Sequence, residues 1–598
     1  MDKLPLEILT QIASHLPFEK TVSRKRPNGK KRKGKRKSYP TGRTAFACLS
    51  RKTQLAVETL VFRDIEIARG DLEEFENAFA DNKALSQHRR ALLKKLKFRL
   101  TLVHDLDCPI NEAKDHEIAT RDIAYGNFAV ISLFDVLVSW QGSATVGFDL
   151  VIEAVSVNDD FKPRPQNELT QPRIELRTAY LSLYDQLFEG KPALSCVRSV
   201  TFARNELRFQ PSAALAVVVQ AGSGQGAPLE RADWGYKEPT AFPRLVRRIR
   251  RDFAQSLQTL RLPPSLRSLK LHMETGWYNH DESVPDFTSP DPPGRDPLCV
   301  GLHRLIADSN LEVFDYAGPV DASLFLPPPD AAKATSSSSS SSTADEPPIF
   351  RSLTNLRVHM FEASPSGRRY FRPAQPRPDN DNAGDEPLPQ THPVWKQAPP
   401  YFYTNAADIL AAMEHWGEFH RKDLTKRDRT VPNDELMLPL LSAFARALAR
   451  MPALKVARLE SKIGPPETKS QDSPDRTWSV DYVAPWQQYE YEAGRGEPLD
   501  LSAPRAYFTV AGGWRPSEEV LQLFRDIGKK RHGRETVVKF AEAEHKHPFG
   551  HVDLNAVGGM SSRDRAALFR EVLAGSMNAP QDRRRERGLL TDRLRFYT

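Results

Sequence analysis

Apolar residues recur at helical spacing in the first stretch of the chain, between Leu4 and Pro17. Five of them fall on one stripe: Ile8, Leu9, Ile12, Ala13 and Leu16. Pro5 suits a first helical turn, because its missing N–H would have no partner inside the helix. We therefore predict a short amphipathic helix. Its roughly three turns are marginal alone in water, so the apolar stripe must pack on something.

A second helical pattern begins at Thr44 and ends in a short strand-like piece, Phe62 to Ile67. Together the two patterns predict two or three small helices in fewer than 70 residues. Such a unit exposes a large apolar surface for its size and usually completes its core against a partner chain. The alternative is that the first helix only caps a larger domain.

The next hundred residues alternate between helical and strand-like patterns. We expect a helix over 72–85, a strand over 92–102, a buried helix over 125–140 and a strand over 146–157. A strand–helix–strand order of this kind favours parallel pairing of the strands.

A short phrase of the form L-x-x-L-x-L recurs through the rest of the chain. It appears as Leu266-Leu269-Leu271, Leu311-Phe314-Tyr316, Leu353-Leu356-Val358 and Leu454-Ala457-Leu459, and more loosely as Val197-Val200-Phe202. Successive good matches lie 45, 42 and 101 residues apart, whereas regular leucine-rich repeats run about 20–29 residues. We predict an α/β fold: an irregular leucine-rich-repeat-like solenoid of strands and helices with long insertions. The alternative is an α/β domain in which the phrases are ordinary buried strands.

Breaker-rich segments divide this body. The chain has 598 residues and 47 prolines, enough for several domains with many turns. We predict a first body part at 70–325, a Ser/Pro-rich disordered linker at 326–348 and a second part at 349–578. We also expect disordered loops near 365–395 and 464–476, and a charged tail at 579–598.

Positive charge is concentrated in one segment. Ten cations and no acid lie between residues 24 and 37: Arg24, Lys25, Arg26, Lys30, Lys31, Arg32, Lys33, Lys35, Arg36 and Lys37. Subtracting these ten charges from the net +8 leaves −2, so a protein-wide nucleic-acid surface is not indicated. The segment is typical of a nuclear localisation signal. Nucleic-acid contact and a plain solvated insertion remain alternatives, although the run contains no aromatic residue for base stacking.

No catalytic or metal-binding pattern emerges. The four cysteines are far apart, and the chain has no Walker loop, H-E-x-x-H or G-x-S-x-G motif. His545, His547 and His551 are close in sequence, but a polar loop explains them better than a metal site. No apolar run is long enough to span a membrane. We expect a protein without catalytic residues, cofactor, metal or membrane segment.

The N-terminal motif resembles an F-box. The similarity lies in Leu4-Pro5-x-Glu7-Ile8-Leu9-x-x-Ile12-x-x-x-Leu16-Pro17, in Ala47-x-Leu49-Ser50-Arg51 and in Leu60-x-Phe62. An F-box is a trihelical motif that docks on the linker subunit of SCF-type cullin–RING ubiquitin ligases. The sequence departs from the pattern at 19–43, where the family has a short connection and this chain has the basic insertion. The resemblance implies an F-box over 1–67 with these linker-binding residues: Leu4, Pro5, Glu7, Ile8, Leu9, Ile12, Leu16, Pro17 and Leu49.

The whole layout is similar to that of fungal F-box proteins with an irregular leucine-rich-like C-terminal region. The resemblance implies a substrate-recognition adaptor of the nucleus or cytoplasm. The F-box would bind the linker subunit and, through it, a cullin, while the body binds an unknown target protein. Trp277, Tyr278 and Trp514 are candidate target contacts. The alternative function is a nuclear structural or nucleic-acid-binding protein that uses residues 24–37.

Overall fold

The computed structural model describes most of the N-terminal helices and the body of the chain. The described residues are 4–16, 42–79, 84–102, 112–140, 147–156, 191–203, 211–222, 229–237, 243–274, 286–288, 296–326, 348–373, 429–463, 476–487, 500–510 and 513–542. Residues 24–37 of the basic insertion lie outside this set.

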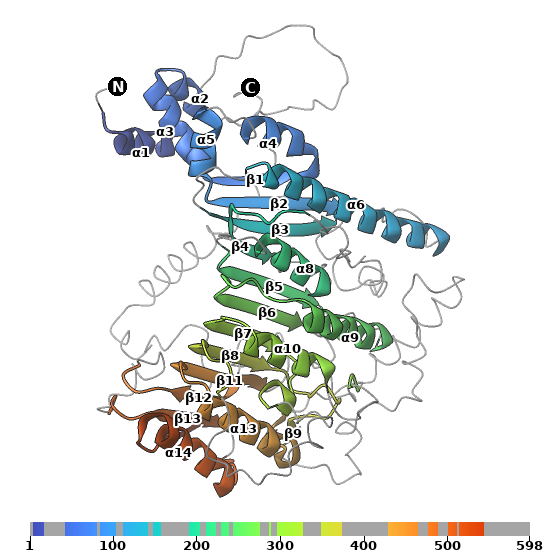
Figure 1. The fold of residues 1–598 in the computed structure, drawn as a ribbon, viewed down its shortest axis with the longest axis vertical. Helices are drawn as coiled ribbons and strands as arrows, with labels where there is room; N and C mark the ends of the chain where they lie inside the picture. The colour runs from blue at the N-terminus through green and yellow to red at the C-terminus, as the bar shows by residue number, and fades with distance from the viewer. Residues whose placement is uncertain are drawn as a thin grey trace, which may run out of the picture.

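Three helices form a unit at the N-terminal end of the structure: α1 (Leu6–His15), α2 (Gly42–Ala47) and α3 (Arg51–Val61) (Figure 1). Ser50 fixes the start of α3, because its side chain accepts a hydrogen bond from the backbone N–H of Thr53 and the Thr53 hydroxyl accepts one from the Ser50 N–H. Helices α1 and α2 both pack on α3. The predicted first helix is confirmed, as is the strand after the second helical pattern.

The body is α/β and contains a twelve-stranded sheet whose strand order follows the chain order, β1 through β8 and then β11 through β14. The strands are β1 (Asp64–Ala68), β2 (Lys95–Leu102), β3 (Phe148–Ser156), β4 (Val197–Phe202), β5 (Arg231–Lys237), β6 (Ser268–Glu274), β7 (Val313–Gly318), β8 (Asn355–Met360), β11 (Val456–Ile463), β12 (Arg476–Val483), β13 (Arg505–Val510) and β14 (Val537–Glu542). Pairing is parallel from β1 to β11, antiparallel for β11–β12 and β12–β13, and parallel again for β13–β14. The expected parallel pairing of the strands at 92–102 and 146–157 is confirmed.

Helices connect the strands. They are α4 (Leu72–Phe79), α5 (Ala84–Leu92), α6 (Glu112–Val138), α8 (Pro211–Gly222), α9 (Pro243–Thr259), α10 (Pro297–Ala307), α13 (Asp434–Ala449) and α14 (Glu518–His532), with 3-10 turns η1 (Arg69–Asp71) and η5 (Ala322–Leu324). Helix α9 packs on α8 and α10, and α13 packs on α14, which gives a helical layer along one side of the sheet (Figure 1). No helix of the described ranges is both long and apolar enough to cross a membrane.

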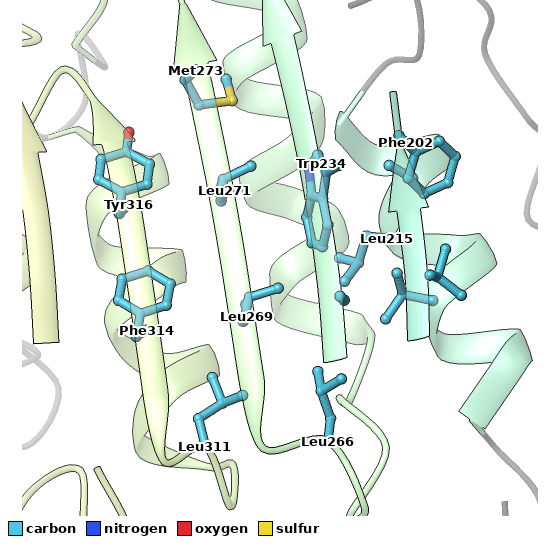
Figure 2. Packing of buried hydrophobic residues seen from close by; sticks show 14 of the residues in the cluster. Phe202, Leu215, Trp234, Leu266, Leu269, Leu271, Met273, Leu311, Phe314 and Tyr316 are labelled. Carbon is cyan, nitrogen blue, oxygen red and sulfur yellow. The ribbon is translucent and has the colours of Figure 1, made fainter. Parts of the chain in front are cut away.

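The repeated phrases occupy matching positions on neighbouring strands. Phe314 of β7 lies in register with Leu269 of β6 and Leu356 of β8, and Tyr316 lies in register with Leu271 and Val358. All of these side chains are buried, and Figure 2 shows those of β6 and β7 aligned along their strands. The irregular spacing of the phrases in sequence therefore does not interrupt the sheet, because the additional residues fall between strands.

Further copies of the phrase were missed from the sequence. Phe62-Ile65-Ile67, Leu93-Leu96-Phe98 and Leu229-Ala232-Trp234 precede and enter β1, β2 and β5 in the same way, and all nine side chains are buried. Aromatic or small residues replace leucine in all three, so the leucine spacing alone did not reveal these copies.

Strands β7 and β8, on either side of 326–348, are direct parallel neighbours in one sheet. One predicted segment needs correction. The predicted loop at 365–395 is wrong over its first residues: Tyr370 and Phe371 are buried, and β9 (Phe371–Pro373) pairs with β10 (Arg429–Pro432). Residues 327–347, 374–395, 464–475 and 579–598 lie outside the described residues.

The helical unit is joined to α5, the helix that precedes β2, through a buried ion pair. Glu58 of α3 and Arg89 of α5, both almost fully buried, approach to 3.4 Å between Oε1 and Nη2. Arg89 also lies over the Phe62 ring, at 4.9 Å from its centroid. One continuous hydrophobic core runs from Leu9 and Ala13 of α1 through the sheet. The helices and the sheet therefore form one packed body.

Candidate interaction surfaces

Helix α1 divides its apolar residues between the interior and the surface. Leu9 and Ala13 are fully buried in the chain's own core. Leu4 and Ile8 remain exposed, at 37% and 42%, and Leu49, after α2, is 60% exposed. The apolar stripe predicted from the sequence is thus partly buried against α3 and partly exposed.

This division corrects the predicted set of linker-binding residues. Leu9 cannot contact another protein, because its side chain is enclosed by the core. Ile12 and Leu16 are half-buried and pack against the same core, whereas Pro5 and Glu7 are exposed. Pro17 lies outside the described residues. We call Leu4, Pro5, Glu7, Ile8 and Leu49 the N-terminal patch.

Exposed apolar side chains are concentrated in this patch. Six large hydrophobic residues of the described chain are exposed, and three of them belong to the N-terminal patch. The other three are Phe128, Trp486 and Val537, which lie on separate elements. Single exposed hydrophobics are ordinary, but a group of them on one small unit marks a candidate interaction site.

Arg43 holds the two ends of the basic insertion together. Its Nε donates to the carbonyl oxygens of Ala13 and Leu16, at 2.9 and 3.1 Å, and its Nη2 donates to that of Ser14 at 3.0 Å. These carbonyls end α1, where a positive charge is favourable. These hydrogen bonds therefore hold the start of α2 against the end of α1, independently of the length of the chain segment that connects the two helices.

The second candidate surface is the face of the sheet opposite the buried ladders, here called the open face. Its central row runs across the strands in register and is mainly polar or charged: Glu66, Lys97, Val151, Thr201, Asp233, Lys270, Asp315, Arg357, Arg458 and Asp481. A strand that buries one face of its side chains and presents polar residues on the other is solvated on that side.

At each end of the open face, charged side chains form ion pairs with neighbours on adjacent strands. At the first end, Lys97 lies 2.8 Å from Glu153 and 3.8 Å from Glu66, and Arg99 lies 3.8 Å from Glu153. Slightly further along, the carboxylate of Asp149 accepts hydrogen bonds from Ser199 at 2.8 Å and from an arginine on each of the next two strands.

At the other end the carboxylate of Glu460 is the centre of a network. Arg357 and Arg458 approach it to 2.7 and 2.6 Å, and the His359 Nδ1 lies 3.7 Å away. Burial alone would raise the pKa of Glu460. The hydrogen bond from His359 and the two arginines outweigh burial and lower that pKa to about 2.

The centre of the open face differs from both ends. Lys270 of β6 and Asp315 of β7 lie directly opposite each other in the register. Lys270 is exposed and Asp315 is half-buried. Within the part of the chain that the structure describes, neither of them forms an ion pair. In the register Lys270 lies between Asp233 and Asp315, and Asp315 also interacts electrostatically with Arg357, so opposite charges face one another along the row.

Trp514, a predicted target contact, anchors a loop: its Nε1 donates to Asp434 at 2.8 Å, and the partly buried side chain packs on the core. Trp277 and Tyr278 lie outside the described residues. Sequence reasoning missed Trp486, which is 72% exposed and has a φ of 63°. Its backbone N–H donates to Leu501 at 2.7 Å. No local sequence signal distinguishes this tryptophan from a buried one.

Among the described residues, no group of three or more His, Cys, Asp or Glu side chains is placed to hold a metal ion. Burial raises the pKa of the Cys196 thiol to about 12, and burial likewise raises that of Cys299. These two thiols are protonated at neutral pH and are poor nucleophiles.

Comparison with known proteins gives no relative: no family model, no curated protein sequence and no solved structure matches the chain.

Proposed function

We propose that the chain is a substrate-recognition adaptor of an SCF-type ubiquitin ligase. In this proposal the N-terminal patch binds the linker subunit, and the body, an irregular leucine-rich-repeat-like solenoid, binds the target. An adaptor needs no active site, since it raises the concentration of a target near a separate transferase. It would act in the nucleus, the cytoplasm or both.

One observation carries the proposal. The three-helix unit has the sequence features of an F-box, and it leaves Leu4, Ile8 and Leu49 exposed on its surface. An apolar group of this kind is stabilised when a partner covers it. The solenoid half of the proposal is supported by the strand order, which follows the chain order, and by the buried phrases in register.

Co-purification of the full chain with an SCF linker subunit tests the proposal. Ile8→Asp and Leu49→Asp should each weaken binding by about 2 kcal/mol, roughly thirtyfold, since each would place a charge in a buried contact. Phe128→Asp is the matched control, because Phe128 is equally exposed but lies on α6.

The design follows from burial. Leu9→Asp is unsuitable, because Leu9 is fully buried and its loss would unfold the unit. A fragment of residues 1–70 is unsuitable too, since it lacks the Arg89 partner of Glu58. Failure of the full chain to bind any linker subunit, or equal binding by wild type and Ile8→Asp, would contradict the proposal.

A second candidate function rests on the ten cations of residues 24–37. A nuclear structural or nucleic-acid-binding protein would use them against phosphates. Its affinity for DNA or RNA would fall steeply with salt, and deletion of 24–37 would abolish that dependence. A salt-independent or unmeasurable affinity would remove this candidate.

A further inference from the structure

The hydrophobic layer of the sheet is finished at its first edge and unfinished at its last. At the first edge both core-facing isoleucines of β1 are buried, and α3 and α4 pack on that strand. At the last edge, Val538 and Phe540 of β14 lie in register with Ala506 and Phe508 of β13. The two β13 side chains are fully buried, whereas Val538 and Phe540 are only partly buried. The outer side of β14 therefore lacks a cover that the core would favour.

The backbone of β14 is also open on this side. Within the described part of the chain, β14 pairs with β13 alone. The N–H of Val537 donates to the Pro504 oxygen at 2.8 Å. Successive residues of a strand direct their N–H and C=O groups to opposite sides, so Val538 and Phe540 direct theirs away from β13. Such an edge is a template for one more strand, and β14 contains no proline that would prevent pairing.

The sequence that follows β14 contains a segment with the pattern of a strand. The described residues end with β14, and residues 543–598 continue directly from it. Residues 551–557 read HVDLNAV, with Val552, Leu554 and Ala556 apolar and polar residues before and between them. Strict alternation of this kind is typical of a strand that buries one face.

We infer that residues 551–557 add a thirteenth strand to the sheet, antiparallel to β14, and so close its last edge. The direction follows from the connection. Residues 543–550 are more than the two to five or so that a hairpin needs, and fewer than the dozen or so that a parallel crossover needs. The inference goes beyond the proposed function and does not depend on it.

The apolar side chains restrict the register. Residues directly opposite each other in an antiparallel pair lie on the same face of the sheet. The apolar set of 551–557 must therefore oppose Val538 and Phe540, because a slip by one residue would turn that set away from the core. Pairing Phe540 with Val552 satisfies this condition. The same register pairs Val538 with Leu554 and covers both partly buried side chains of β14.

Charge selects this register from the others that keep the apolar faces together. Lys539 lies on the opposite face of β14 from Phe540, and in this register it is opposite Asp553. A slip by two residues in either direction would place Asn555 or His551 there instead. Opposite charges that face each other across two strands are stabilising. The apolar and the charged positions thus favour the same alignment.

Disulfide formation in the full chain tests the register. Cysteines at directly opposite, non-hydrogen-bonded positions have Cα atoms about 4.5 Å apart, within the range a disulfide accepts. Lys539→Cys combined with Asp553→Cys should therefore form a disulfide under mild oxidation at least about tenfold faster than two control pairs. The controls combine Lys539→Cys with Leu554→Cys, on the other face, or with Asn555→Cys, two residues along. Mass spectrometry of the linked peptides identifies each bond.

Hydrogen exchange gives a second test without cysteines. The outward amides of Val538 and Phe540 should be protected in the wild-type chain. Leu554→Asp places a charge against the core and should speed their exchange at least about tenfold. The matched control is Asn555→Asp, which adds the same charge on the solvated face and should change it less than about threefold.

Three results would overturn the inference. Equal disulfide rates for the three cysteine pairs would show that 551–557 holds no fixed place beside β14. Disulfides joining isotopically heavy to light chains in a mixed sample would identify a second copy as the occupant of the edge. Amides of Val538 and Phe540 that are unprotected in the wild type, or that stay protected when 551–557 is deleted, would show an open edge or a different cover.

Discussion

The buried pair between Glu58 of α3 and Arg89 of α5 predicts how firmly the N-terminal helices are held to the rest of the chain. Their side chains are 0% and 5% exposed. Arg89→Leu would leave the Glu58 carboxylate buried without its cation, and would also remove the hydrogen bond to Ala78 and the contact with the Phe62 ring. Breaking one partner of such a pair typically costs about 3–5 kcal/mol.

Hydrogen exchange is the suitable assay, because it reports the local stability of α3 separately from that of the rest of the chain. A cost of about 3–5 kcal/mol corresponds to faster exchange of the α3 amides by about two to four powers of ten. Peptides from α13, at the opposite end of the sheet, should exchange as in the wild type and serve as the internal control.

A double variant separates charge from packing. Glu58→Leu with Arg89→Leu removes the stranded charge and should return α3 exchange to within about tenfold of wild type, since apolar replacement of a buried pair is often close to neutral. If the single variant changes α3 exchange less than tenfold, or if the double variant is no better than the single one, the pair does not hold α3 to α5.

Three further changes test other parts of the structure. Gly533→Ala should lower the unfolding free energy by about 1–2 kcal/mol in thermal denaturation, because this residue ends α14 with a φ of 70° and an added Cβ would meet no other atom. The control is Gly70→Ala, where an added Cβ is equally free of contacts but φ is not positive, and it should have little effect in the same assay. Burial, with the Asp296 carboxylate adding to it, raises the pKa of Asp321 to about 6, so its charge disfavours the folded state above about pH 6 and the penalty fades as pH falls towards 4. Asp321→Asn should therefore be more stable than wild type at pH 7.5, with a gain that shrinks by pH 4.5 in chemical denaturation; a gain independent of pH would contradict this. Replacing 18–41 by a short Gly/Ser loop should leave the melting temperature within about 2 °C, since Arg43 already holds the loop ends and closure depends weakly on length; a large drop would show that the segment supports the helices.

Local patterns predicted the elements well. The strand at 92–102, the helix at 125–140 and the strand at 146–157 all appear. The hydrophobic period and the residue composition of a segment are local properties, and each strand of this sheet must keep them because one of its faces is buried. The disordered loop expected from 365 was wrong at its start because Phe371 gains a pairing partner, β10, more than fifty residues away.

Which side chains are exposed was harder to predict, because burial also depends on elements that are distant in the sequence. Leu9 and Ile8 are neighbours in sequence with similar side chains, and only the position of α3 decides that one is enclosed and the other is open. The pairing of Lys97 with Glu66 and Glu153 likewise depends on strands that are distant in the sequence. Neither property is encoded in the neighbouring residues.

The coincidence of strand order and chain order has a consequence for how the molecule tolerates change. Each connection has to return only to the position beside the strand it has just left, so the lengthening of one connection shifts no other pairing. Such an architecture can accept inserted sequence of almost any length at its turns while the sheet keeps its geometry.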